Sequence, residues 1–138
     1  SSLKRNLDFR YNKDIEFEQG GKTMLLLCYP KCSTCMKAKK HLNQLGVVFE
    51  ERDISRENPT AEELKQWIAR SGLPVKKFFN TSGKLYQSLQ LKDRLPQMSE
   101  AEMIELLASD GMLVKRPLLM DQDRVLVGYR AEAYEQLV

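Results

Sequence analysis

The sequence contains few of the residues that define several classes of protein. Its 138 residues include only three cysteines, one histidine and one tryptophan. Three cysteines are too few for a secreted scaffold held together by disulfides. No apolar run approaches the roughly 20 residues of a membrane-spanning helix, and the N-terminal segment lacks the apolar core of a secretory signal. We therefore expect a cytoplasmic protein with no membrane partner.

A strong charge bias is also lacking. The formal net charge at pH 7 is +3, and 42% of the residues are hydrophobic and 30% charged. This composition is typical of a globular domain, and the length suffices for one domain with a core. Because the basic residues are scattered over several predicted elements, we expect no direct DNA binding.

The most informative stretch is residues 24–45. An apolar segment typical of a buried strand is followed by Cys32-Ser-Thr-Cys35 and then by an amphipathic segment. A Cys-x-x-Cys in this position is typical of a thioredoxin-like redox motif. The first turn of a helix stabilises a thiolate, so we predict Cys32 to be the exposed, low-pKa nucleophile. Cys35 shares the apolar face of the helix, and we predict it to be the sheltered resolving thiol.

A zinc site is the alternative use of these cysteines, with Cys28, Cys32, Cys35 and His41 as ligands. Cys28 lies in the predicted strand, about 13 Å before Cys32 at the rise of a strand. The four side chains are therefore not expected to converge on one tetrahedral ion. We predict no metal site, a Cys28 that behaves as a small buried hydrophobic residue, and a His41 that is exposed beside the lysines of the helix.

The order of the remaining elements indicates an α/β fold. A strand at 47–54 after the first helix implies a parallel βαβ unit. Residues about 59–110 carry helical patterns and two capping boxes, which predict an all-helical insertion. An antiparallel hairpin at 118–127 and a closing helix at 131–138 follow. The predicted fold is a thioredoxin-like mixed sheet, βαβ then ββα, with an all-helical insertion.

Residues 1–23 are predicted to form an N-terminal extension, either native or added for expression. Apolar and polar residues alternate at 7–11 and 15–18 with a turn-like segment between them, which predicts a β-hairpin. Gly20-Gly21 is typical of a linker to the domain at 24–138.

The segment Tyr29-Pro-Lys-Cys-Ser-Thr-Cys-Met-Lys-Ala-Lys-Lys40 resembles the active-site segment of the arsenate reductase (ArsC)/Spx family. Residues 75–84, Lys115-Arg-Pro117 and Val127-Gly-Tyr129 match later landmarks of that family in the same order. The resemblance implies that Cys32 is the nucleophile. It also implies that Arg116 lies beside this cysteine to stabilise its thiolate and bind an oxyanion, and that Pro117 is cis and faces the site.

The sequence departs from the arsenate-reducing members of the family, which place further arginines around the oxyanion. The helical insertion offers Lys76 and Lys77 instead, and the end of the last strand offers Arg130, one residue away from the family's position. Lysine supplies charge without the planar fork of arginine. We predict that these three residues, with Pro117, contact the substrate. Cys35 is a second departure, because glutaredoxin-dependent arsenate reductases manage without it.

Two functions follow from the resemblance. The first is a thiol–disulfide oxidoreductase that reduces an oxyanion such as arsenate, or a small or protein disulfide. It would hold no bound cofactor and would draw electrons from glutathione/glutaredoxin or thioredoxin. The second is an Spx-like redox-sensing transcriptional regulator that binds the RNA polymerase α subunit. The region around Gly72 resembles the segment used for that contact, although a glycine there is also typical of a helix C-cap.

Overall fold

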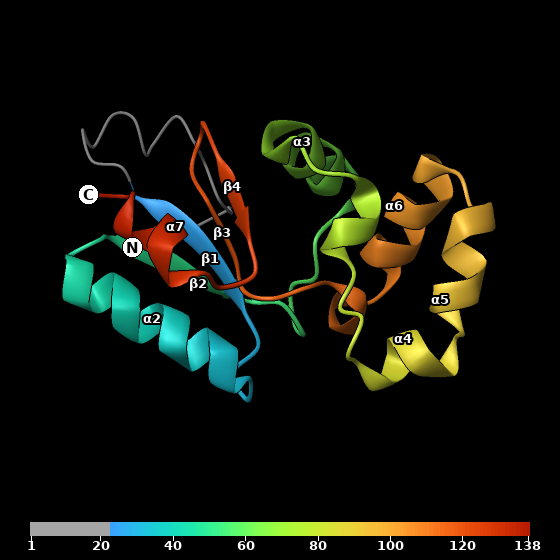
Figure 1. Ribbon diagram of the computed structural model, residues 1–138, viewed down its shortest axis with the longest axis horizontal. Helices are drawn as coiled ribbons and strands as arrows, with labels where there is room; N and C mark the ends of the chain where they lie inside the picture. The colour runs from blue at the N-terminus through green and yellow to red at the C-terminus, as the bar shows by residue number, and fades with distance from the viewer. Residues whose placement is uncertain (1–22) are drawn as a thin grey trace.

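The computed structural model describes residues 23–138, so the predicted hairpin at 7–18 lies outside the described residues. Four strands form one mixed sheet in the order β2-β1-β3-β4 (Figure 1). The strands are β1 Met24–Cys28, β2 Phe49–Asp53, β3 Leu118–Met120 and β4 Val125–Val127. β1 is parallel to β2 and antiparallel to β3, and β3 and β4 form the predicted antiparallel hairpin.

Strand β1 lies inside the sheet and is covered on both faces, which explains its continuous apolar sequence. All five of its residues are buried. Leu25 and Leu27 face the core beneath the helical insertion. Met24, Leu26 and Cys28 face a second core. The alternation of a strand therefore places Cys28 on one particular face of the sheet.

Helices α2 Ser33–Leu45 and α7 Ala131–Glu135 cover the face to which Cys28 points (Figure 1). Cys32 has an extended backbone, with ψ 119°, and is the N-cap of α2, so the helix begins one residue later than predicted. Gly46 ends the helix in the left-handed conformation, with φ 75°, which glycine adopts without steric cost. The two cysteines of the Cys-x-x-Cys motif are thus held in the first turn of α2.

The predicted all-helical insertion covers the other face of the sheet (Figure 1). Both predicted capping boxes are present, at the N-termini of its two longest helices. The elements are α3 Ala61–Ser71, 3-10 helix η1 Val75–Phe78, α4 Lys84–Ser88, α5 Leu91–Arg94, 3-10 helix η2 Leu95–Gln97, α6 Glu100–Ser109 and 3-10 helix η3 Gly111–Leu113. None of the helices within residues 23–138 is long and apolar enough to cross a membrane.

Two connecting segments run side by side and bring the insertion to the sheet. Phe79 forms an antiparallel bridge with Val114. The Asn80 N–H donates to the Leu113 carbonyl at 2.8 Å, and the Lys115 N–H donates to the Phe78 carbonyl at 2.8 Å. This pairing places the segment that follows η1 next to the segment that leads into β3.

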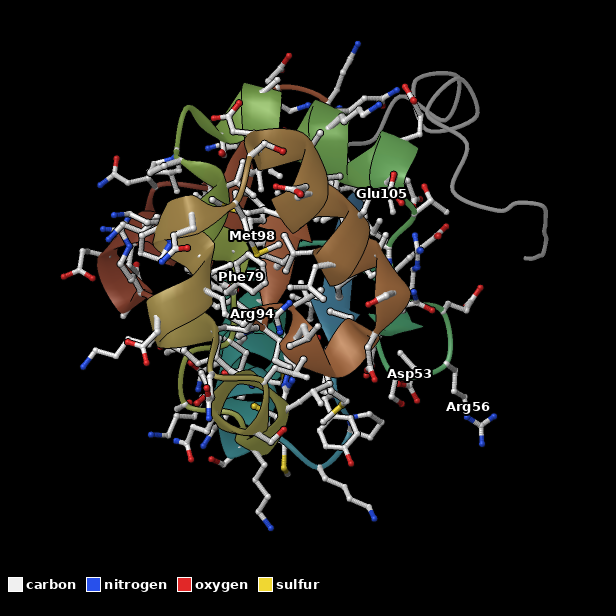
Figure 2. The ribbon with its side chains drawn as sticks, turned by 90° about the vertical axis from the view of Figure 1, so that its right-hand side faces the viewer. Asp53, Arg56, Phe79, Arg94, Met98 and Glu105 are labelled. Carbon is white, nitrogen blue, oxygen red and sulfur yellow. The ribbon has the colours of Figure 1, made fainter. Side chains whose placement is uncertain are left out.

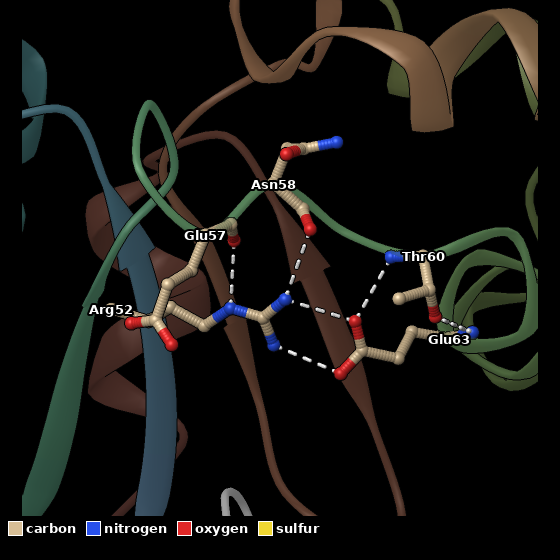
Figure 3. A network of polar contacts seen from close by, with 5 residues as sticks. All are labelled: Arg52, Glu57, Asn58, Thr60 and Glu63. Atoms are coloured by element: carbon tan, nitrogen blue, oxygen red, sulfur yellow. Dashed lines mark hydrogen bonds and ion pairs between the residues drawn. The ribbon is translucent and has the colours of Figure 1, made fainter.

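An arginine fixes the connection from β2 to α3 (Figure 3). Arg52 donates to both carboxylate oxygens of Glu63 at 2.9 Å, and also to the carbonyls of Glu57 at 2.9 Å and Asn58 at 3.2 Å. Glu63 in turn completes the capping box with Thr60. Burial is the largest single effect on the pKa of Glu63 and raises it. The hydrogen bonds from Arg52 and Thr60 and the charge of Arg52 together outweigh burial, so the pKa lies below its ordinary value. The contact ties the end of the βαβ unit to the insertion.

Candidate functional site

The three cysteines gather where β1 ends and α2 begins. Cys32 is partly exposed, Cys35 is about 1% exposed and Cys28 is fully buried. All three are free thiols. The predicted arrangement of an accessible first cysteine and a sheltered second cysteine is therefore confirmed.

Cys35 lies at the centre of this group and accepts several hydrogen bonds. The Cys28 thiol, the Tyr29 backbone N–H at 3.4 Å and the Cys32 thiol all donate to its sulfur. The bond from Cys28 is the largest cause of a pKa lowered from 9.0 to about 6, and it outweighs burial, which acts the other way. The positive charge of Arg116 lowers the pKa slightly further. The pKa of Cys28 is raised, first by its hydrogen bond to Cys35 and then by burial.

The hydrogen-bond donors are distributed over the cysteines differently from what the sequence predicts. The prediction relied on helix N–H groups near Cys32, but the Cys32 side chain makes no capping hydrogen bond. The donors converge on Cys35 instead, because the alternation of β1 points Cys28 towards α2. That Cys32 is the low-pKa thiol stays a prediction, whereas the structure lowers the pKa of Cys35.

A cleft of about 560 Å³ opens beside Cys32. Three cations line it, namely Lys115, Arg116 and Arg130, and no carboxylate of the described residues does. A cleft with one sign of charge concentrates ligands of the opposite sign. Its remaining walls come from three segments, with lining residues Thr34, Asn80, Ser82, Gly83, Val127, Gly128 and Tyr129.

Arg116 lines this cleft and is held by two contacts. Its guanidinium lies 5.1 Å from the centre of the Tyr29 ring, and Nη1 donates to the Met112 carbonyl at 3.4 Å. The Arg116–Pro117 peptide bond is cis, as the resemblance implies. Pro117 itself is buried and does not line the cleft. Its contact with substrate therefore stays a prediction, while the arginine before it lines the same cleft as Cys32.

The structure separates the other predicted binding residues. Arg130 lines the cleft, as predicted from its place near the end of β4. Lys76 and Lys77 are exposed on η1 and are not among the residues that line the cleft, because the short helix buries Val75 and Phe78 and turns the lysines outward. Gly72 is the left-handed C-cap of α3, with φ 71°, and is exposed.

Three residues that line the cleft, Asn80, Ser82 and Lys115, were not predicted from the sequence to be site residues. Asn80 and Ser82 fall within residues 75–84 and Lys115 within Lys115-Arg-Pro117, segments that the sequence marks only as landmarks of the family. All three line the cleft because the segments after η1 and before β3 pair with each other. Gly128 permits the close approach of Lys115, since a Cβ there would lie 3.1 Å from the lysine Cε.

The prediction that His41 is exposed is wrong. Its residue exposure is 9%, and it faces α7 and the segment after β4 rather than solvent. Its ring nitrogens contact Tyr129 and Glu135, and its ring stacks on Tyr134 at a centroid distance of 5.7 Å. The hydroxyl of Tyr134 has no hydrogen-bond partner among the described residues.

No three His, Cys, Asp or Glu side chains within residues 23–138 lie close enough to hold a metal ion.

A second hollow of about 490 Å³ lies on the insertion, where Arg94, Met98 and Glu105 line it (Figure 2). It shares no residue with the cleft at Cys32. Of these two hollows, only the first is lined by a cysteine, Cys32.

The chain is similar to several known proteins. The model of the ArsC family matches residues 27–137. YusI of Bacillus subtilis, an uncharacterized protein, is 53% identical over 108 residues, covering 78% of this chain and 92% of the relative. The regulatory protein MgsR of the same organism is 33% identical over 101 residues, covering 73% and 79%. The crystal structure of an ArsC family related protein from Bacteroides fragilis is 54% identical with a TM-score of 0.82, covering 84% of this chain and 98% of that one. Since the family model spans the cysteines, the cis proline and the cleft, the chain belongs to the ArsC family.

Proposed function

We propose that this protein is a thiol–disulfide oxidoreductase, in which Cys32 attacks a disulfide or an oxyanion in the cationic cleft and Cys35 resolves the product. One observation carries the proposal. Cys32 is a partly exposed thiol beside a cleft lined by three cations, and a second thiol with a pKa of about 6 lies one helical turn away. The lowered pKa increases the share of Cys35 that is thiolate near neutral pH, and the thiolate is the form that attacks a disulfide.

The reduction of a disulfide substrate by the two cysteines requires no bound cofactor. The Cys32 thiolate attacks one sulfur, forms a mixed disulfide and releases the other half of the substrate as a thiolate. Cys35 then attacks the Cys32 sulfur, forms the Cys32–Cys35 disulfide and releases the second half. An external dithiol or glutathione restores both thiols. We propose glutathione/glutaredoxin or thioredoxin as this donor, and the reducing cytoplasm as the compartment.

The cationic cleft also suits an oxyanion such as arsenate. Arg116 offers the planar fork that binds two oxygens of an anion, and Lys115 and Arg130 add charge. Asn80 and Ser82 offer further hydrogen-bonding groups. We propose that Lys76 and Lys77 act only on a larger substrate that extends beyond the cleft.

Turnover tests this function directly. Purified protein is assayed with arsenate and with small disulfides, each with glutathione/glutaredoxin and with thioredoxin and its reductase. We expect reduction of at least one of these substrates, and its loss in Cys32→Ser. The exposed Gln87→Ala on α4 is the matched control and should turn over at the wild-type rate. Absence of turnover with every pair, in protein whose thiols titrate as reduced, would contradict the proposal.

A regulatory function is the second candidate, and the 33% identity to the regulatory protein MgsR favours it. In this case the Cys32–Cys35 pair would act as a redox switch, and exposed Gly72 would lie in a contact with the RNA polymerase α subunit. A pull-down with the C-terminal domain of that subunit tests it. Gly72→Arg should abolish binding, whereas Gly72→Asn, which tolerates the left-handed conformation, should retain it.

A further inference from the structure

His41 joins two residues that flank a cation of the cleft. Its Nε2 lies 2.6 Å from Glu135 Oε2, and its Nδ1 lies 2.9 Å from the Tyr129 hydroxyl. A carboxylate can only accept, so the Nε2–H donates to Glu135, and in the neutral ring Nδ1 accepts from the Tyr129 hydroxyl. Arg130 lies between these two partners in the sequence. We call His41, Tyr129 and Glu135 the His41 clamp.

Aromatic packing holds the clamp in one arrangement. The His41 ring stacks on Tyr134, and the Tyr129 ring meets Tyr134 edge-on at a centroid distance of 4.9 Å. Such edge-to-face pairs stabilise the fold beyond the contribution of the apolar area that they bury. The clamp therefore fastens the segment after β4 and the last residue of α7 to α2, the helix whose N-cap is Cys32.

The side chain of Arg130 has no hydrogen-bond or ion-pair partner among the described residues. It is exposed, it lines the cleft, and it forms no ion pair with a described carboxylate. Its backbone is the N-cap of α7. The Arg130 carbonyl accepts from the N–H groups of Ala133 and Tyr134, so the backbone of Arg130 moves with α7. The side-chain hydrogen bonds that tie α7 and Tyr129 to α2 are those of His41.

We propose that His41 is a positioning residue. It holds Tyr129 and Glu135 to α2, and thereby keeps Arg130 in the wall of the cleft, where its charge favours anionic over neutral reagents at Cys32. The proposal rests on the proposed function only in taking Cys32 as the reacting thiol, and it requires no turnover.

Alkylation of Cys32 measures this preference. The rate with anionic iodoacetate is divided by the rate with neutral iodoacetamide, and peptide mapping confirms the modified cysteine. The same thiolate attacks both reagents and displaces iodide, so a change in its pKa cancels in the ratio. A unit charge at about 10 Å in water changes the rate of an anionic reagent by about twofold. Arg130→Gln should therefore lower the ratio by about that factor.

Variants of the clamp should reproduce this loss. His41→Phe keeps a ring against Tyr134 but removes both hydrogen bonds, and it should lower the ratio about as much as Arg130→Gln. Tyr129→Phe removes one hydroxyl and should lower the ratio in the same direction, which keeps the test usable if His41→Phe folds poorly. His41→Asn, whose amide can reach the Nδ1 position, should restore part of the ratio.

The double variant and a control complete the experiment. His41→Phe combined with Arg130→Gln should lose no more than Arg130→Gln alone, because both changes remove the same charge from the cleft. Gln44→Ala, an exposed uncharged change on α2, should keep the wild-type ratio. An unchanged ratio in both His41→Phe and Tyr129→Phe would overturn the proposal, and so would an unchanged ratio in Arg130→Gln or additive losses in the double variant.

Discussion

The Cys28 thiol is the group that most strongly stabilises the Cys35 thiolate. It donates a hydrogen bond to Cys35, and this bond is the largest cause of the lowered pKa. A pKa that falls from 9.0 to about 6 corresponds to roughly 4 kcal/mol in favour of the thiolate. A buried cysteine outside the Cys-x-x-Cys motif thus stabilises the thiolate of Cys35.

Replacing Cys28 by alanine removes this donor. A hydrogen bond to a charged group contributes about 1.5–3 kcal/mol, which corresponds to a pKa change of about one to two. Cys28→Ala should therefore raise the pKa of Cys35 from about 6 to roughly 7–8. The remaining lowering comes from the Tyr29 N–H, the hydroxyl or thiol at position 32 and the charge of Arg116.

The assay isolates Cys35 as the titrating thiol. In a Cys32→Ser background, which keeps a donor at that position, the ultraviolet absorbance of the thiolate is followed against pH. Cys28→Ala and Cys28→Ser are compared in this background, so that Cys35 is the single cysteine in both proteins. Serine keeps a donor and should leave the midpoint lower than alanine does. Equal midpoints in the two proteins would refute the reasoning.

Three further predictions follow from the same contacts. The folded protein holds the pKa of Cys35 below 9.0, so between about pH 6 and 9 the unfolded chain binds one more proton than the folded protein does. The free energy of unfolding of the reduced protein, measured with urea, should therefore rise with pH over this window. Cys35→Ala should lack the rise. Arg116→Ala should slow alkylation of Cys32 by iodoacetate at pH 7 by a few-fold. Arg116→Lys should recover the alkylation rate more fully than the rate of oxyanion reduction, since lysine lacks the planar fork of the guanidinium. Equal recovery of both rates would contradict a bidentate contact between Arg116 and the oxyanion. Arg52→Met should lower the free energy of unfolding by about 2 kcal/mol at pH 7, and because the pKa of Glu63 is lowered, this loss should shrink as the pH falls through that pKa; a loss that is independent of pH would speak against the pair.

Local signals in the sequence predicted the elements that local interactions determine. The capping boxes at Thr60 and Ser99 are present because they involve residues three apart. The helix after Cys32 and its end at Gly46 follow from spacing and from a backbone conformation that glycine favours. The same logic placed Cys35 on the buried face.

The rest of the site depends on contacts between distant segments. Asn80 reaches the cleft because its segment pairs with the one before β3, and no short-range pattern records that pairing. His41 is different, because it lies three residues after buried Ala38 and so falls on the same face of α2. The neighbouring lysines obscured that signal. The effect of Cys28 on Cys35 could have been inferred from the alternation of β1, which points Cys28 towards α2.

Trapping the mixed disulfide tests the central claim most directly. Cys35→Ser protein is mixed with oxidised glutathione, and the adduct is located by intact mass and peptide mapping. The account predicts one glutathione on Cys32 in Cys35→Ser and no adduct in Cys32→Ser. In the wild type it predicts that the bound glutathione is released, that a Cys32–Cys35 disulfide forms and that Cys28 stays reduced. An adduct on Cys28, or a wild-type disulfide that contains Cys28, would contradict the assignment of Cys32 as nucleophile and Cys35 as resolving thiol.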